Sequence, residues 1–234
     1  MTEKLKILTE DEELEEFVFD GGSDIAVPVT LDESDGVVTL TVYSRYMREA
    51  EEFAGKYGGD PFSKEALAYL DGVFSPLMEK AGFRFECEYD QTVLNFASDV
   101  EVPVTDCGAD IVFADTNEKL NELYLSTTRD IEIDDDDPCD VVFAAVKDGA
   151  ALSVASVNDY SDNGSVEINV ETEKNSRGKG YATAAVSSLV NYLVSLGETV
   201  SYRCRKSNAA SRRVAEKAGL KYKGKTFFYV CYKK

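Results

Sequence analysis

The chain has 234 residues, of which 44% are hydrophobic and 29% are charged, and its formal net charge is −19. This is the composition of a globular protein. No apolar run is long enough for a membrane-spanning helix or a signal peptide, so we expect a cytoplasmic protein with no membrane partner. The absence of histidine excludes Ser-His-Asp and Cys-His nucleophiles and leaves acid–base work to other side chains or to water.

The charge is divided unevenly along the chain. Residues 1–173 carry 42 acids and 11 bases, a net charge of −31, whereas residues 174–234 carry 2 acids and 14 bases, a net charge of +12. Such a field favours a small polyanionic ligand at the basic end and disfavours nucleic acid at the acidic remainder. Solvated charge without a ligand is the alternative interpretation.

Metal chemistry has little support in the sequence. The five cysteines form no C-x-x-C pair and have no histidine beside them, and the acidic run at 134–137 lacks the spacing of an EF-hand loop. We therefore expect no metal site, and thiols that are reduced and mostly buried.

Residues 1–105 predict an accessory region that mixes helices and strands. Hydrophobic periodicity indicates strands over residues 25–31, 37–42, 83–89 and 92–96 and helices over residues 45–56 and 64–81. The similar pentapeptides EKAGF and EKAGL at 79–83 and 216–220 indicate either a degenerate duplication or two helices that end independently at glycine. The acidic charge of this region could attract a cationic amine or could serve solubility.

Residues 106–234 predict a second domain that begins with a strand at 110–114 and a helix at 116–125. Strands then follow at 141–146, 151–157 and 166–171, with turn signals at Asp148-Gly149 and Asn163-Gly164, so we expect three antiparallel strands. In the last of them, Val166, Ile168 and Val170 share one face and Glu167, Asn169 and Glu171 the other.

The remaining elements predict a crossover unit. An apolar-periodic helix after residue 180 ends at Gly197, and a strand at 199–204 follows, which makes that strand a parallel neighbour of the strand at 166–171. A helix that Ser207 or Asn208 caps then runs to Lys217, and a final strand occupies residues 226–232.

The segment at 177–183, RGKGYAT, carries the clearest functional signal. The start of a helix has backbone N–H donors without intrahelical partners, and Gly178 and Gly180 keep side chains away from them. Arg177 and Lys179 add positive charge, so the segment predicts a diphosphate site. A dinucleotide-binding fingerprint fits less well, because a polar stretch separates the segment from its strand and the next strand ends in arginines. A Walker A loop is excluded by its spacing.

These features together resemble the GNAT family of N-acetyltransferases over residues 108–234. The pattern R-x-x-G-x-A at 177–182 fits the family's signature for acetyl-coenzyme A. The helix NAASRRVAEKAGL at 208–220 is similar to the family's Asn-led helix, and the order of elements agrees. The resemblance implies a mixed α/β fold, a largely antiparallel central sheet flanked by helices, in which two strands separate at the coenzyme.

By position, the resemblance also implies the residues that contact acetyl-coenzyme A. The amides of 177–183 would hold the diphosphate, the strand end at 170–172 would pair with the pantetheine amides, and the helix start at 208–211 would contact the pantetheine arm. The residues concerned are Val170, Glu171, Thr172, Arg177, Gly178, Lys179, Gly180, Tyr181, Ala182, Thr183, Asn208 and Ser211.

The catalytic chemistry is less defined. Glu167 is the candidate base, directly or through water, because it lies on the non-core face of its strand, and Glu171 competes for this role. The family's usual tyrosine acid falls at Ala215, although Tyr181, Tyr202, Tyr229 or Ser211 could replace it.

We therefore predict an enzyme that transfers an acetyl group to a primary amine of a small molecule or peptide. A non-catalytic module that binds acyl-coenzyme A is the alternative, and a homodimer is left open.

Overall fold

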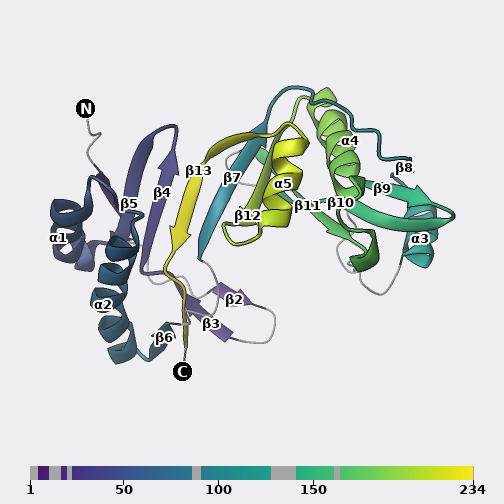
Figure 1. Cartoon of the computed structure of the whole chain (residues 1–234). Helices are drawn as coiled ribbons and strands as arrows, with labels where there is room; N and C mark the ends of the chain where they lie inside the picture. The colour runs from purple at the N-terminus through teal and green to yellow at the C-terminus, as the bar shows by residue number, and fades with distance from the viewer. Residues whose placement is uncertain are drawn as a thin grey trace. The chain divides into compact units, whose positions relative to one another are not determined.

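The computed structural model describes residues 5–10, 17–19, 23–85, 91–127, 141–160 and 164–233 (Figure 1). The chain forms two compact units. One comprises Met1–Leu94, Arg205–Ser207 and Lys223–Lys234, and the other comprises Asn95–Cys204 and Asn208–Tyr222. Since a compact unit is not necessarily a folding domain, the predicted division after residue 105 stays a prediction. None of the described helices is long and apolar enough to cross a membrane.

The first unit contains a sheet in the order β1-β5-β4-β13. Its strands are β1 (Lys6–Glu10), β4 (Val29–Ser34), β5 (Val37–Tyr43) and β13 (Lys221–Phe228), the last of which belongs in part to each unit. A tight turn at Asp35-Gly36, with φ of 49° and 80°, joins β4 to β5 as an antiparallel pair. β13 is antiparallel to β4, and β1 is parallel to β5.

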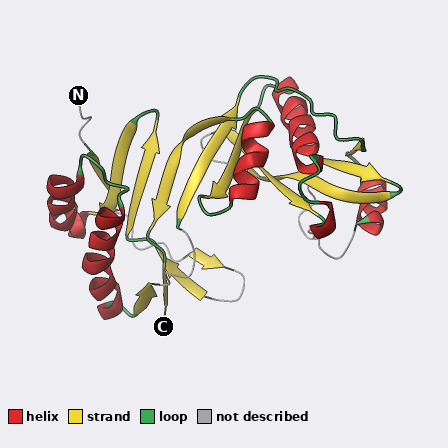
Figure 2. Cartoon of the chain, viewed as in Figure 1, coloured by secondary structure: helices red, strands yellow, loops and turns green. Residues whose placement is uncertain are grey.

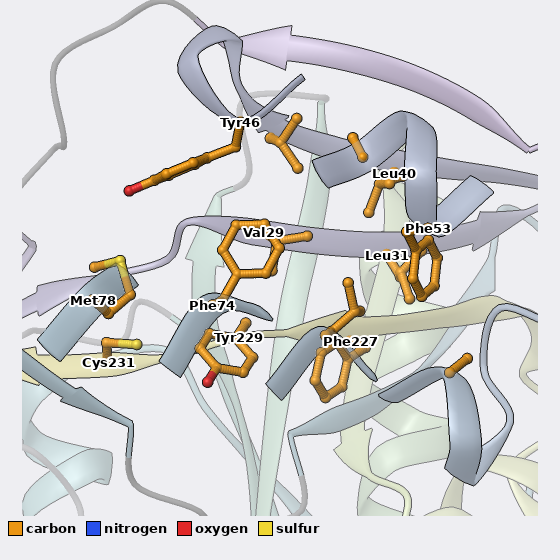
Figure 3. Close-up of a cluster of buried hydrophobic side chains, with 14 of the residues drawn as sticks. Val29, Leu31, Leu40, Tyr46, Phe53, Phe74, Met78, Phe227, Tyr229 and Cys231 are labelled. Atoms are coloured by element: carbon orange, nitrogen blue, oxygen red, sulfur yellow. The ribbon is translucent and has the colours of Figure 1, made fainter. Parts of the chain in front are cut away.

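The first unit has two helices, α1 (Met47–Tyr57) after the 3₁₀ turn η1 (Ser44–Tyr46) and α2 (Lys64–Lys80) (Figure 2). Their buried side chains supply much of this unit's core. Ser63 caps α2 by accepting a hydrogen bond from the N–H of Ala66. The rings of Phe74 and Tyr229 lie 6.0 Å apart in this cluster (Figure 3). The largest fully buried side chains around them include Leu31, Leu40, Phe53, Leu70 and Met78.

A second, small sheet in the first unit corrects two sequence predictions. Its order is β2-β3-β14-β6, from β2 (Phe17–Phe19), β3 (Ser23–Ala26), β14 (Cys231–Lys233) and β6 (Phe83–Phe85). The single strand predicted at 25–31 is wrong, because the chain leaves β3 at Val27-Pro28, where proline cannot donate to a ladder. The strand predicted at 226–232 is likewise two strands, β13 and β14. The predicted continuation of β6 over 86–89 lies outside the described residues.

The second unit contains the sheet order β7-β12-β11-β10-β9-β8. Its strands are β7 (Thr92–Ser98), β8 (Asp110–Ala114), β9 (Val142–Lys147), β10 (Ala150–Tyr160), β11 (Ser165–Thr172) and β12 (Thr199–Arg205). The start of β7 and the last residue of β12 belong to the first unit. The strands from β8 to β11 are antiparallel neighbours, whereas β11 and β12 are parallel. The predicted mixed, largely antiparallel sheet is confirmed, and so is the hairpin at Asp148-Gly149, where φ is 53° and 78°.

Helices cover both faces of this sheet. The helix α3 (Asn117–Ser126) packs Leu120 and Leu123 against Ala144 and Val154. The helix α4 (Tyr181–Ser195) uses the other face, where the Tyr192 ring lies 4.9 Å from Phe113 and 5.8 Å from Phe143. Because neighbouring residues of a strand point to opposite faces, Phe143 and Ala144 place the two helices on opposite sides of the sheet.

The start of the second unit is tied to α4. The Asn191 side chain accepts a hydrogen bond from the N–H of Val102 at 2.7 Å and donates one to its carbonyl at 3.0 Å. The helix α5 (Ala209–Lys217) ends at Gly219, whose φ is 89°. Gly82 after α2 has the same φ, so both pentapeptides predicted as helix stops end their helices at a left-handed glycine.

Candidate functional site

The end of β11 is fixed before the glycine segment begins. Ser153 is fully buried on β10, and its hydroxyl donates to the carbonyl of Glu171 at 2.6 Å and lies 2.9 Å from the hydroxyl of Thr172. The Glu173 carboxylate then accepts the N–H of Asn175 at 3.0 Å and starts the 3₁₀ turn η2 (Lys174–Ser176). Hydrogen bonds, first from the Ser176 side chain and then from Asn175, lower the pKa of Glu173. This carboxylate therefore stays ionised and holds the turn.

The glycine segment turns the chain directly into α4. Gly178 and Gly180 both have left-handed φ, 77° and 92°, which a residue with a Cβ adopts only at a cost. Gly180 is the N-cap and has no side chain to cap the helix. The N–H of Ala184 donates to the carbonyl of Gly180 and makes the first hydrogen bond of the helix. The earlier N–H groups of α4 therefore have no intrahelical acceptor, and the positive end of the helix dipole lies among them.

The surroundings of this helix start fit a diphosphate. A Cβ built on Gly178 would meet no atom within 4 Å, so the approach to the amides there is open. The exposed side chains of Arg177 and Lys179 bring positive charge, and Arg177 donates to the carbonyl of Thr172 at 3.3 Å. Tyr181 and Thr183 are buried, so neither offers an exposed side chain to a ligand. The structure thus brings the predicted segment from 177 to 183 together in a form that suits an anion-binding loop.

The parallel ladder between β11 and β12 is short. It pairs Ser165–Glu167 with Thr199–Ser201 and ends there, although β11 continues to Thr172 and β12 continues to Arg205. The strand end at 170–172, which the resemblance assigns to the pantetheine arm, lies beyond the ladder and pairs with β10 on its other edge. The structure thus has a place where two parallel strands cease to pair, next to the start of α4, which has no side-chain cap.

Glu167 lies at the end of this ladder and forms an ion pair with Arg203 of β12. Glu167 sits directly opposite Ser201, and Arg203 is the next residue of β12 on the same face. The Glu167 side chain is 12% exposed and that of Arg203 is 49% exposed. The prediction that Glu167 points away from the core-facing positions holds, but this residue is buried rather than solvated.

The opposite face carries a second polar pair at the same level of β12. The hydroxyls of Tyr202 and Ser211 lie 2.7 Å apart, and Tyr202 is almost fully buried. Burial raises the pKa of Tyr202, and the hydrogen bond with Ser211 opposes that shift. Burial also raises the pKa of the neighbouring Cys204 thiol, which interacts with Ser211 as well. Tyr202 is therefore a protonated phenol at neutral pH.

The start of α5 positions this hydroxyl pair. The Asn208 side-chain oxygen caps the helix by accepting the N–H of Ser211 at 3.0 Å, so the predicted contact of Asn208 with pantetheine would have to use its amide nitrogen. Ala215 is fully buried and offers no acid. Of the other predicted acids, Tyr229 lies in the first unit and donates to Asp71 at 2.9 Å.

The sequence prediction missed Arg203, Ser153 and Glu173. The sequence shows Arg203 near the end of a strand expected beside the Glu167 strand, but the register that brings the two side chains together comes from the structure. Ser153 and Glu173 had none, because their roles depend on hydrogen bonds to a neighbouring strand and turn. No group of three potential metal ligands occurs in the part of the chain that the structure describes.

The sequence model of the GNAT acetyltransferase domain matches residues 85–221. The chain belongs to the GNAT acetyltransferase family. One similar curated relative is an uncharacterised N-acetyltransferase, YjdG, of Bacillus subtilis, which is 39% identical over 67 residues. That match covers 27% of this chain and 39% of the relative, so it spans well under half of the relative's length.

A solved GNAT structure shares the fold, and a second is reported beside it. A putative GNAT acetyltransferase from Novosphingobium aromaticivorans is similar with a TM-score of 0.50 and 20% identity, over 65% of this chain and 68% of the other. A GNAT-like protein from Streptococcus suis covers 90% of this chain and 88% of its own, with a TM-score of 0.45 and 19% identity. The expected membership of the GNAT family and the expected fold are confirmed, and acetyl transfer is the activity typical of the family.

Proposed function

We propose that this GNAT protein transfers the acetyl group of acetyl-coenzyme A to a primary amine. The observation that carries the proposal is the start of α4, where two left-handed glycines leave the first backbone N–H groups uncapped beside Arg177 and Lys179. A diphosphate bound there would receive hydrogen bonds and the favourable end of the helix dipole. The coenzyme would supply the thioester; the chain would supply its binding and the positioning of the amine.

The end of the β11–β12 ladder is where we place the reacting groups. Holding an amine and a thioester in one place can contribute on the order of 7–11 kcal/mol to catalysis, which is more than acid–base catalysis typically supplies. The contact with Arg203 uses Oε2 of Glu167. The second oxygen, Oε1, is then available to accept a proton from the amine or from an intervening water.

The Tyr202–Ser211 pair is our candidate for the proton that the thiolate needs. It lies on the helix face of β12, and its phenol is protonated at neutral pH because burial raises the pKa of Tyr202. The pair would replace the tyrosine that the family usually carries at the position of Ala215. The small amine acceptor, the cytoplasmic location and the acetyl-coenzyme A contacts of residues 170–172 and 208 belong to the same proposal.

A second candidate function is a non-catalytic module that binds acyl-coenzyme A, because the buried Ala215 removes the usual acid. Release of free coenzyme A thiol, measured over a panel of primary amines, separates the two. We expect amine-dependent release that falls about 10²–10⁴-fold in Glu167→Gln, the usual range for acid–base catalysis. Glu118→Gln, at an exposed position of α3, is the control and should change the rate little. Binding of acetyl-coenzyme A without release over the whole panel would favour the binding module.

A further inference from the structure

We propose that the acceptor amine carries a carboxylate, as an amino acid does, and that Arg203 binds this carboxylate while Glu167 receives the amine. The inference rests on the proposed acetyl transfer and names its substrate class. It starts from an ion pair that lies at the end of the β11–β12 ladder, on the sheet face opposite α4. An ion pair that only stabilises the fold does not require an exposed cation, whereas the Arg203 side chain of this pair is half exposed.

The two partners differ in exposure. The Glu167 carboxylate is nearly buried, while half of the Arg203 side chain remains accessible. A guanidinium has five N–H donors in a planar fork, and its contact with one oxygen of Glu167 leaves several of them. That fork matches a carboxylate in two-point geometry better than any other side chain does. Arg203 can therefore hold a second carboxylate from the solvent side.

Binding of such a ligand would also change the state of Glu167. A carboxylate at Arg203 competes with Glu167 for the same cation, and a buried carboxylate that loses its partner gains affinity for an ammonium group or its proton. The amine of the same ligand supplies that group. The carboxylate of the acceptor thus releases Glu167 from Arg203, and Glu167 can then contact the amine of the same acceptor.

A third charged residue near the ion pair fits a ligand that carries both an ammonium group and a carboxylate. Asp159 of β10 lies directly opposite Glu167 in the register and is exposed. An amino acid can direct its ammonium group to Asp159 and Glu167 and its carboxylate to Arg203. An amine without a carboxylate would bring only its positive charge close to the positive Arg203 and would have no group to pair with it.

The test compares matched acceptors that differ only in the carboxylate. Amino acids are each paired with their decarboxylated amine, for example lysine with 1,5-diaminopentane and phenylalanine with 2-phenylethylamine. Release of coenzyme A thiol gives kcat/KM for each. We expect the kcat/KM of the preferred amino acid to exceed that of its amine about tenfold or more.

In Arg203→Gln the kcat/KM for the amino acid should fall about 10–100-fold, the effect of losing a charged hydrogen-bond partner, while the kcat/KM for the matched amine changes little. Arg203→Lys should give an intermediate loss, and Arg213→Gln on α5 is the control that should change neither.

Glu167→Gln distinguishes an Arg203 that binds the acceptor from an Arg203 that only holds Glu167 in place. If Arg203 binds the acceptor, this variant should lower kcat, and the KM of the amino acid should fall relative to the KM of its matched amine. Both ligands lose the attraction between Glu167 and their ammonium group, but only the amino acid gains from an Arg203 that no longer has a competing carboxylate. Equal losses for amino acids and amines in Arg203→Gln, or equal use of both by the unmodified protein, would overturn the inference and leave acetyl transfer intact. Absence of acetyl-coenzyme A binding in calorimetry would instead overturn the proposed function, and this inference with it.

Discussion

Among single residues, Cys231 shows how burial controls chemistry outside the site. The side chain is fully buried in the first unit, and burial, with a smaller contribution from the Asp71 charge, raises the pKa of its thiol to about 12. Between pH 9, the ordinary value, and pH 12 the folded protein keeps a proton that the unfolded chain releases. The contribution of this thiol to stability is therefore complete below pH 9 and is lost as the pH rises.

The prediction for Cys231 concerns this pH dependence. Urea unfolding at a series of pH values from 7 to 10.5 should show the free energy of unfolding of Cys231→Val falling less steeply above pH 9 than that of the unmodified protein. The largest difference in slope for one group is about 1.4 kcal/mol per pH unit. Cys107→Val, at a half-buried position, is the control. Parallel curves for Cys231→Val and the unmodified protein would contradict the assignment.

The Tyr202–Ser211 hydrogen bond gives a second residue-scale prediction. Tyr202→Phe and Ser211→Ala each remove one partner of the 2.7 Å contact, and each should cost about 0.5–1.5 kcal/mol of stability. If the pair supplies the proton for the thiolate, Tyr202→Phe should also lower kcat with a leaving thiol of high pKa more than with an activated acyl thioester. Tyr192→Phe, which keeps its ring contacts with Phe113 and Phe143, serves as the control. An unchanged kcat for Tyr202→Phe with both thioesters would remove the pair from the mechanism.

At the scale of elements, α4 has a left-handed glycine at each end. Gly180 begins the helix with φ of 92°, and Gly197 follows its last turn with φ of 89°. An alanine at either position costs about 1–2 kcal/mol, because its Cβ disfavours this conformation. A Cβ on Gly197 would meet nothing within 4 Å, and one on Gly180 would lie an ordinary 3.7 Å from Cys107. The two substitutions are thus matched in strain.

Their effects on coenzyme binding should differ. Gly180→Ala disturbs the amides that we assign to the diphosphate, so we expect about tenfold or greater loss of acetyl-coenzyme A affinity, the effect of losing charged hydrogen bonds. Gly197→Ala should lower the melting temperature by a similar amount and leave the affinity unchanged. Thermal unfolding and calorimetry on both variants check this. Equal affinities for the two variants would place the coenzyme elsewhere.

Elements of the second unit were largely predictable from the sequence, and the reason is local. Alternation in β11, the Asp148-Gly149 turn and the glycines that bound α4 and α5 each determine structure within a few neighbouring residues. The first unit depended on distant partners. Tyr229 interrupts the last strand while its N–H donates to the carbonyl of Val29, a contact that no local pattern reveals.

The candidate site was predictable to the same limited extent. The glycine segment at 177–183 is a local motif and was found. The ion pair of Glu167 was not found, because it requires the register of two strands that are separated by α4 in the chain. The side chains at the ladder end therefore depend on topology, whereas the glycine segment can be read from the local sequence.

At the scale of the whole molecule, the charge asymmetry agrees with a polyanionic ligand. Residues 174–234, with a net charge of +12, include the glycine segment, β12 and α5, which together border the place where β11 and β12 cease to pair. The acidic remainder, with a net charge of −31, would repel nucleic acid. This division of charge fits the proposed coenzyme site at the basic end of the chain.

The most direct measurement is isothermal titration calorimetry of the unmodified protein with acetyl-coenzyme A and, separately, with S-acetylpantetheine, which lacks the diphosphate. We predict saturable binding of acetyl-coenzyme A with a Kd of about 1–100 μM, within the usual range for enzyme substrates. S-acetylpantetheine should bind at least about 100-fold more weakly, since it forfeits the charged hydrogen bonds at the start of α4. No saturable heat with millimolar acetyl-coenzyme A, or equal affinity for both ligands, would contradict the account.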